Sequence, residues 1–335
     1  MKTPMPKILG NEKLKSRLCS DILEGTSAHA YIFLGATGSG KHTLAMQCAA
    51  AVACEKKGDL SAPLPCGNCP TCQKILAGKS PDVITISKDG ASIKIKQMRE
   101  LPMDVRKYPI DLEDKFYIIE DAHTMTEDAQ DAFLQTLEEP PAFVHFFLLC
   151  ESEEPLLETI RSRAPLLRTE PIPTEQIRAY LKENTPEAST LSKEAFDQLL
   201  SIANGSIGRA KELLSTTERE PLVKLRQTAE TLVRSALDKN IAGLIEQINL
   251  FPKKHDELLP IFASAQTALR DLIALKQDES APLCFYVDRA ETLEITYRYS
   301  RSALFKLADL LAEVDDRLQK NANAKLTLTA MIAKL

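Results

Sequence analysis

The sequence has no tryptophan, and aromatic residues make up only 5% of its 335 residues. This scarcity argues against a fold that binds single-stranded nucleic acid by stacking bases on aromatic side chains. Basic charge is not in excess either, since 42 Lys and Arg residues stand against 47 Asp and Glu residues and the net charge is −5. Any contact with nucleic acid is therefore expected from a local patch or from within a larger assembly.

Long apolar segments are also lacking. No run approaches the ~20 apolar residues that span a bilayer, so we expect no contact with a membrane. The first residues, MKTPMPKILGNEK, contain no long apolar core, so we expect no signal peptide. These absences predict a cytoplasmic protein, and its eight cysteines are therefore not interpreted first as disulfides.

Apolar strand candidates alternate with helical stretches in the first half of the chain. The candidates are AYIFL (30–34), DVITI (82–86), KFYIIED (115–121) and FVHFFLLC (143–150). This alternation predicts a parallel sheet with helices on its faces. After about Arg168 the strand signals stop, and the pattern is helical apart from a turn-rich stretch near DESAPLCFYVDRAE.

The segment GATGSGKHT has the spacing of a phosphate-binding loop between a strand and a helix. Such a loop needs glycines so that backbone N–H groups face phosphate oxygens, a Lys for the β- and γ-phosphates, and a hydroxyl for Mg²⁺. Lys41 fits, but His42 stands at the hydroxyl position, and imidazole is a poor ligand for Mg²⁺. A glycine-rich turn without a ligand is the alternative. The predicted nucleotide-binding residues of this loop are Gly35, Ala36, Thr37, Gly38, Ser39, Gly40, Lys41, His42 and Thr43.

The strand FYIIED ends with Glu120 and Asp121. P-loop enzymes place an Asp at such a strand end to hold Mg²⁺. A solvated acidic loop is the alternative, and it would be preferred if the segment stood alone. Because the glycine loop lies upstream, we predict that Glu120 and Asp121 belong to the catalytic site.

Four cysteines, Cys54, Cys66, Cys69 and Cys72, form the pattern C-x11-C-x2-C-x2-C. Two C-x-x-C steps with a fourth thiolate nearby suit a tetrahedral Zn²⁺ site. Four thiolates leave no open coordination position, so the zinc is expected to be structural. A redox-active C-x-x-C pair is the alternative. The remaining cysteines are expected to be packed in the interior: Cys19, Cys48, Cys150 and Cys284.

Taken in chain order, these segments resemble the bacterial clamp loader family of AAA+ proteins up to about Leu214. ILGNEKLKSRL and SAHAYIFLGATGSGKHTLA look like the family's opening and phosphate-loop segments, and the four cysteines match its zinc module. The string IIEDAHTMTEDAQDAFLQTLEEPP is similar to its acidic strand and the helix that follows. TIRSRAP is similar to its Ser-Arg-Cys segment, with Ala164 in place of Cys.

Within that family, ANGSIGRAKELL (Ala203–Leu214) is more similar to the delta-prime branch than to the gamma/tau branch, and the short chain agrees. The resemblance implies an α/β P-loop (AAA+) parallel-sheet domain with a zinc module, followed by a small helical lid domain and an all-α collar domain. The expected boundaries are 1–170, with the zinc module at 54–72, then 171–220 and 221–335.

The resemblance also implies roles for single residues. Lys41 and its loop would hold the phosphates of ATP or ADP, with or without Mg²⁺, and Arg209 would contact the nucleotide from the lid. Arg163 would be an arginine finger that points into a neighbouring subunit's ATP site. The alternatives are that Arg163 belongs to a surface cluster with Arg161 and Arg168, and that Arg209, near a helix start, faces a carboxylate rather than a phosphate.

Three departures from the family weaken the hydrolytic end of the expected site. His42 replaces the hydroxyl that binds Mg²⁺. The usual Asp-Glu is inverted to Glu120-Asp121, and placement errors on the order of 1 Å can cost about 10²-fold in rate. The family's small polar sensor position falls near Cys150 and Glu151, where an acid would repel a γ-phosphate.

We therefore expect a delta-prime-like subunit of the DNA polymerase III clamp loader, within the polymerase holoenzyme, that binds nucleotide and hydrolyses it poorly. It would supply Arg163 in trans, a contribution that can be worth about 10³–10⁵ in rate. The expected partners are the gamma/tau and delta subunits, the sliding clamp, and primed DNA through the complex. Two alternatives stay open: an active gamma-type ATPase, and a structural zinc-bearing subunit that binds no nucleotide.

Overall fold

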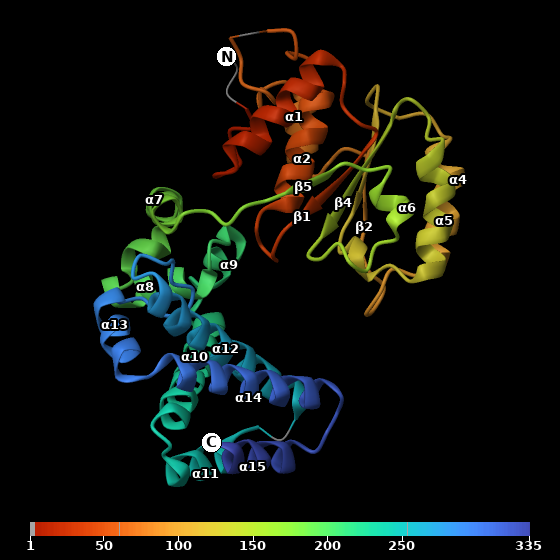
Figure 1. Ribbon diagram of the computed structural model, residues 1–335. Coiled ribbons are helices and arrows are strands. Elements are labelled where there is room, and N and C mark those ends of the chain that lie inside the picture. Colours follow the sequence, from red (N-terminus) through yellow and green to blue (C-terminus); the bar gives the residue numbers. More distant parts are fainter. Residues whose placement is uncertain (1–3, 60, 253) are drawn as a thin grey trace. The chain divides into compact units, whose positions relative to one another are not determined.

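The computed structural model describes residues 4–59, 61–252 and 254–335 (Figure 1). The chain divides into two compact units. The first ends at Ile177 and also includes Gly205–Arg209, and the second comprises Arg178–Asn204 and Ala210–Leu335. The strands of the described chain lie in the first unit, and the second unit is helical.

Five parallel strands form one sheet in the order β2-β3-β4-β1-β5. β1 lies between β4 and β5, with Ile32 opposite both Leu148 and Leu166. The four predicted strands are confirmed, and a short fifth strand was missed because its three residues carry too little pattern. The bounds are β1 Ala30–Leu34, β2 Val83–Ile86, β3 Lys115–Ile119, β4 Val144–Cys150 and β5 Leu166–Arg168.

Helices cover both faces of the sheet (Figure 1). One face packs against α1, α2 and α3, and the other against α4, α5 and α6. Side chains that alternate along each strand feed the two clusters, as expected for a sheet buried on both sides. The bounds are α1 Glu12–Glu24, α2 Lys41–Val52, α3 Pro70–Leu76, α4 Ile95–Val105, α5 Glu127–Glu138 and α6 Glu158–Arg161.

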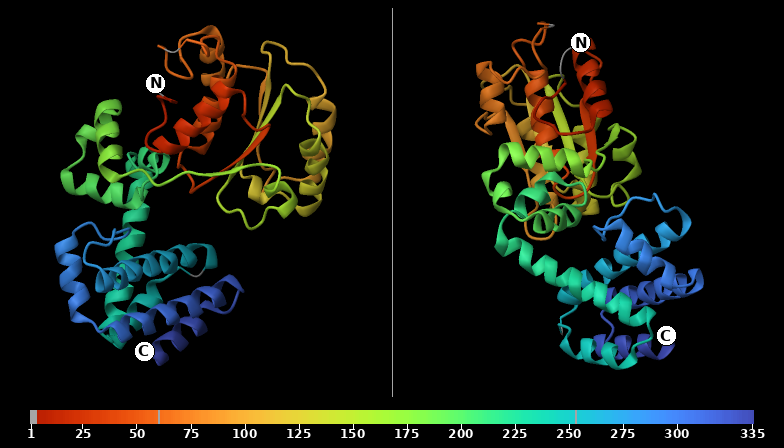
Figure 2. Two further views of the ribbon diagram at one scale, coloured as in Figure 1. Left: turned by 45° about the horizontal axis from the view of Figure 1, so that its top comes forward. Right: turned by 90° about the vertical axis from the view of Figure 1, so that its left-hand side faces the viewer.

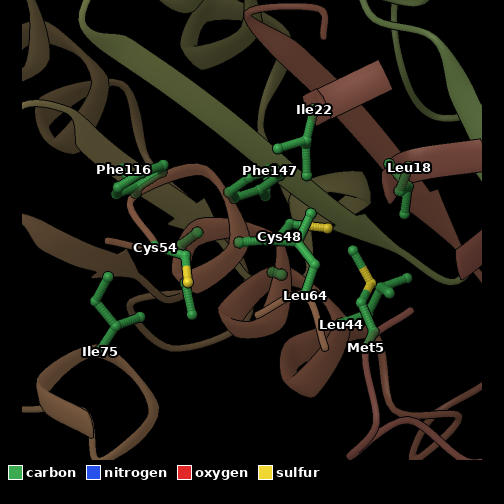
Figure 3. Packing of buried hydrophobic residues seen from close by; sticks show 14 of the residues in the cluster. Met5, Leu18, Ile22, Leu44, Cys48, Cys54, Leu64, Ile75, Phe116 and Phe147 are labelled. Atoms are coloured by element: carbon green, nitrogen blue, oxygen red, sulfur yellow. The ribbon is translucent and has the colours of Figure 1, made fainter. Parts of the chain in front are cut away.

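Figure 3 shows the cluster on the α1 and α2 face. Phe116 of β3 and Phe147 of β4 lie with rings nearly parallel and centroids 6.3 Å apart. Leu44 and Cys48 of α2 are buried in the same cluster. This packing fixes α2, and with it the glycine loop that precedes the helix.

The second unit is a bundle of helices around α12 (Figures 1 and 2). α12 packs against α10, α13 and α14, and α15 packs against α14 and α11. The helices after the sheet are α7 Thr174–Asn184, α8 Lys193–Ala203, α9 Ile207–Glu212, α10 Thr216–Leu237, α11 Ile241–Leu250, α12 His255–Gln277, α13 Arg289–Arg298, α14 Arg301–Gln319 and α15 Ala324–Lys334. Short 3-10 turns lie between β3 and α5 at Ala122–Thr124 and between α7 and α8 at Pro186–Thr190.

One helix of the described chain has the length of a membrane span, although the sequence predicted no such segment. Glu257–Gln277 of α12 is long and apolar enough to cross a bilayer by length and composition. Its apolar side chains Phe262, Leu269 and Leu272 are buried in the bundle. A central core helix has the same composition, so this segment is weak support for a membrane.

Asp271 anchors the turn-rich segment before α13. Its side chain is fully buried, and its carboxylate accepts backbone N–H groups from Cys284, Phe285 and Tyr286 at 2.7–3.2 Å. Arg270 Nη1 lies 3.0 Å from the same carboxylate. A buried charge needs such partners, so this residue fixes the path of the chain between α12 and α13.

We predict that Asp271→Ala lowers the free energy of unfolding by about 3 kcal/mol, because buried N–H groups left without an acceptor cost about 1–3 kcal/mol each. Urea unfolding followed by circular dichroism measures the change. Asp309→Ala, on the exposed side of α14, is the control and should stay within about 0.5 kcal/mol of the wild type. Equal midpoints for the two variants would contradict the assigned role of Asp271.

Candidate functional site

The carboxyl ends of the parallel strands meet at one edge of the sheet, and the predicted nucleotide site lies there. Gly35 follows β1, Glu120 and Asp121 follow β3, and Glu151 follows β4. Ligands of open α/β sheets bind at this edge. The fold therefore brings together segments that lie far apart in the sequence.

The glycines of the loop are required by close contacts. A Cβ atom on Gly35 would lie 1.9 Å from Thr169 Oγ1, and one on Gly38 would lie 2.5 Å from Ser206 Oγ. Gly38 also has a φ of +71°, which side-chain-bearing residues rarely adopt. Ser39 Oγ lies 3.1 Å from Thr169 Oγ1. The loop is thus held by the segment after β5 and by the Gly205–Arg209 segment.

Lys41 is the first residue of α2, and its ammonium group turns back over the loop. Nζ donates to the carbonyl oxygens of Gly35 at 2.6 Å and Ala36 at 2.8 Å. Burial lowers the pKa of Lys41, while the carboxylates of Glu151 and Asp121 act in the opposite direction. Gly40 caps α2 without a side-chain acceptor, so the N–H groups of the first helical turn, which include those of His42 and Thr43, are open to an anion.

His42 and Glu120, two of the residues that depart from the family pattern, contact each other. His42 Nε2 lies 3.7 Å from Glu120 Oε1. Glu120 Oε2 accepts a hydrogen bond from Ser87 Oγ at 2.7 Å. Asp121 has a left-handed φ of 49°, and its Oδ2 lies 3.1 Å from Lys88 Nζ. Each carboxylate therefore already has a protein partner.

These residues do not fit magnesium. Mg²⁺ prefers a near-octahedral set of oxygen ligands at about 2.0–2.1 Å. His42 offers nitrogen in place of the hydroxyl, one oxygen of Glu120 accepts a hydrogen bond from Ser87, and the other lies 3.7 Å from His42 Nε2.

Glu151 lies against the phosphate loop, as the sequence indicated. The hydroxyl of Thr37 donates a hydrogen bond to Glu151 Oε1. The carboxylate also stands among the charges that act on Lys41. A negative group beside the loop disfavours a further phosphate there.

The backbone of the Gly205–Arg209 segment lies on the same loop. Gly208 N–H donates to the Gly38 carbonyl at 2.9 Å, and Ser206 Oγ donates to the Thr37 carbonyl at 3.1 Å. Arg209 is exposed, and its guanidinium has no ion-pair partner within the described ranges. The fold therefore brings Arg209 to the loop but does not give it the carboxylate partner considered as the alternative.

Arg163 lies apart from this group, at the opposite edge of the sheet. It precedes β5, and Ile32 N–H of β1 donates a hydrogen bond to the carbonyl oxygen of Pro165, so Arg163 stands near the amino ends of the strands. Its Nη2 lies 2.7 Å from Glu138 at the end of α5. The guanidinium is 38% exposed. Arg163 therefore cannot serve the loop of its own chain.

The four predicted zinc ligands lie together. The sulfur atoms of Cys54, Cys66, Cys69 and Cys72 are all within 4.8 Å of one another, and all four residues are buried. The Sγ atoms of Cys66 and Cys72 are 3.9 Å apart. A tetrahedral site with Zn–S bonds of about 2.3 Å has sulfur atoms about 3.8 Å apart, so the donor set fits zinc.

Backbone N–H groups support the thiolate form of Cys66, whereas burial raises the pKa values of Cys54 and Cys72. Cys69 N–H lies 3.4 Å from Cys66 Sγ, and Cys72 N–H lies 3.3 Å from Cys69 Sγ. Burial opposes ionisation of Cys66, but hydrogen bonds from Asn68 and Cys69 outweigh it and lower its pKa to about 7. A lone redox pair would not need two further thiols at this range, so the arrangement favours a metal.

Sequence reasoning missed four residues that shape the site: Ser87, Lys88, Thr169 and Ser206. Ser87 and Lys88 follow β2, which pairs with β3, so the strand-end rule could have indicated them. Thr169 follows the unpredicted β5. The contact of Ser206 with Thr37 depends on the tertiary path of the chain and has no local signal.

Together, the strand order, the glycine loop after β1 and the acidic residues after β3 define a P-loop protein of the AAA+ type. The family described as "DNA polymerase III, delta subunit" matches residues 10–173. The chain is similar to the gamma, tau and delta-prime subunits of DNA polymerase III.

Three relatives illustrate the match. The chain is 34% identical over 214 residues to subunit tau of Salmonella typhimurium, covering 63% of this chain and 32% of tau. It is 28% identical over 305 residues to subunit gamma of Buchnera aphidicola, covering 90% and 78%. It is 34% identical over 177 residues to subunit delta' of Bacillus subtilis, covering 53% and 50%. The match therefore spans about a third of tau and half of delta'.

We predict that Cys69→Ser abolishes binding of one zinc ion per chain and lowers the melting temperature by about 5 °C or more, because a structural zinc contributes directly to folding. Metal analysis of the purified protein and a thermal melt measure both effects. Cys284→Ser, outside the cluster, is the matched control and should keep the zinc. Stoichiometric zinc in Cys69→Ser would contradict the assignment.

Proposed function

We propose that this chain is a delta-prime-like subunit of the DNA polymerase III clamp loader, which helps to load the sliding clamp onto primed DNA. It binds ATP or ADP, hydrolyses it poorly, and supplies Arg163 to a neighbouring subunit. The observation that carries the proposal is the contact of His42 with Glu120 beside a loop that keeps its phosphate-binding groups.

Nucleotide binding is supported by the groups that the loop retains. Lys41, the N–H groups at the start of α2 and the exposed guanidinium of Arg209 all suit a phosphate. Gly35 and Gly38 leave the room that close backbone approach needs. Binding displaces the Lys41 ammonium from its two loop carbonyls, an exchange of one set of charge-assisted bonds for another.

Weak hydrolysis is supported by the side chains at the positions where a P-loop enzyme orients water and binds a metal ion. His42 replaces a hydroxyl, Glu120 is held by His42 and Ser87, and Glu151 lies against Thr37. None of these arrangements stabilises negative charge that develops on a transferred phosphoryl group. The bound nucleotide would therefore stabilise the site of this chain without being hydrolysed there.

A role for Arg163 in trans is supported by its position at the amino edge of the sheet. An arginine finger in trans stabilises charge on a neighbour's transferred phosphoryl group. Glu138 holds the guanidinium in the free chain, and release from this exposed ion pair costs about 0–1 kcal/mol. The exchange of Glu138 for a phosphate is therefore inexpensive.

The partners in this proposal are the gamma/tau and delta subunits, the sliding clamp, and primed DNA through the complex. The expected division into 1–170, 171–220 and 221–335 would make the last part the collar that binds other subunits. Exposed apolar side chains on α11 and α15 support such a surface, with Leu250 85% and Leu326 71% exposed. A replication subunit of this kind acts in the cytoplasm.

An active gamma-type ATPase is the second candidate, because gamma and tau subunits are among the relatives. It predicts that the purified chain turns over ATP as fast as its partner subunits do.

A third candidate is a structural zinc-bearing subunit that binds no nucleotide. It is favoured by the hydrogen bonds of the Lys41 ammonium group with the carbonyls of its own loop. Direct nucleotide titration separates these readings.

We predict that the purified full-length chain binds a fluorescent ADP analogue saturably, and that Lys41→Ala weakens this binding by about tenfold or more, as loss of a charge-assisted bond implies. Fluorescence titration measures the dissociation constants. Lys79→Ala, an exposed residue away from the loop, should bind as the wild type does. No saturable signal in the wild type would support the structural reading instead.

We predict that Arg163→Ala in the reconstituted complex lowers ATP turnover at the neighbouring site by about 10³-fold or more, since an arginine finger contributes about 10³–10⁵. ATPase assays with clamp and primed DNA measure the rate, and gel filtration checks assembly. Arg161→Ala, two residues earlier at the end of α6, is the matched control for a general loss of surface charge. Equal rates for both variants would remove the role in trans.

A further inference from the structure

We infer that the phosphate loop takes up a nucleoside diphosphate without a divalent cation, and that the contact between His42 and Glu120 closes the position of the metal. This inference rests on the nucleotide binding proposed above. It adds the metal requirement of the site and the number of phosphates that the site accepts.

Two side chains, His42 and Glu120, occupy the place where a P-loop enzyme binds Mg²⁺. His42 occupies the hydroxyl position at the start of α2, and its Nε2 lies 3.7 Å from Glu120 Oε1. Ser87 Oγ holds the other oxygen of Glu120 at 2.7 Å. A hard cation that needs oxygen ligands would have to break both contacts and still meet a nitrogen.

The second carboxylate of the acidic pair is also engaged. Asp121 Oδ2 lies 3.1 Å from Lys88 Nζ. Lys88 thus places a positive charge beside Asp121. In a P-loop enzyme that charge would come from the metal ion. Asp121 therefore has a counter-ion in Lys88, and Glu120 has a hydrogen-bond donor in Ser87, both from the loop after β2.

The charges around the loop favour two phosphates over three. Lys41 and Arg209 are the cations beside the loop, and the first turn of α2 adds its N–H groups. Glu151, held by the hydroxyl of Thr37, places a negative charge against the same loop. Without a metal to offset it, a third phosphate adds repulsion from Glu151, whereas a diphosphate keeps the contacts with the loop.

The test is a titration of the zinc-loaded protein with fluorescent ADP and ATP analogues, in excess Mg²⁺ and in buffer with no added divalent cation and no chelator. We expect the ADP dissociation constant to change by less than about twofold between the two conditions, and ADP to bind more tightly than ATP, because the site offers no oxygen set for the metal. A tightening by Mg²⁺ of about tenfold or more would overturn this inference and leave the proposed nucleotide binding intact. Absence of binding in both conditions would overturn the two together.

A restored site provides the complementary test. His42→Ser combined with Glu120→Asp and Asp121→Glu returns the hydroxyl and the family's acidic order. We expect Mg²⁺ to tighten ATP binding by about tenfold in this variant, while Glu127→Asp, an exposed residue of α5, stays insensitive to the metal. If the folded triple variant is also insensitive to Mg²⁺, the role given to the His42–Glu120 contact is wrong.

A direct metal measurement does not depend on that variant. Mn²⁺ is titrated into wild-type protein held in excess over ADP, and its electron paramagnetic resonance signal is followed. We expect no ternary complex of protein, ADP and Mn²⁺. A ternary complex with one Mn²⁺ per bound nucleotide would overturn the inference.

Discussion

The parallel pairing of five buried strands is the constraint on which the candidate site depends. Because every strand runs in the same direction, the carboxyl ends meet at one edge and bring Lys41, Glu120 and Glu151 within reach of one nucleotide. An antiparallel strand would have taken one of these groups to the other edge. The same constraint takes Arg163, which precedes β5, to the amino edge. The proposed nucleotide site and Arg163 are thus separated by the length of the strands.

Close backbone approach is the second condition, and it depends on two glycines. The Cα of Gly38 would lie 2.8 Å from a Cβ on Gly208, so neither position tolerates a side chain without a shift of the backbone. This contact brings the start of α9, and with it Arg209, to the phosphate loop. A segment that follows the sheet by more than thirty residues in the chain, at Gly205–Arg209, therefore belongs to the same compact unit as the loop. The nucleotide site is sensitive to the conformation of this segment.

Most of the sheet could be predicted from the sequence, because apolar runs such as AYIFL and FVHFFLLC report burial on both faces. The cysteine cluster could be predicted for a similar reason, since its spacing alone brings the thiols together. β5 could not, because three residues carry no periodicity. Because β5 was not predicted, Thr169, whose hydroxyl lies against the loop at Gly35, was missed as well. The proximity of His42 and Glu120 could not be predicted either, because it depends on the registers of β1 and β3 on the two sides of β4.

The residues that depart from the family pattern lie at the carboxyl edge of the sheet, and Arg163, which matches the pattern, lies at the amino edge. At the carboxyl edge the groups that grip phosphate are kept, while those that seat a metal contact each other or other side chains. At the amino edge Arg163 is exposed and contacts Glu138 and the carbonyl oxygen of Thr159. Under the proposed function, nucleotide would shape the loop and the attached Gly205–Arg209 segment at the carboxyl edge of the sheet. The amino edge would present Arg163 to the site of a neighbouring subunit.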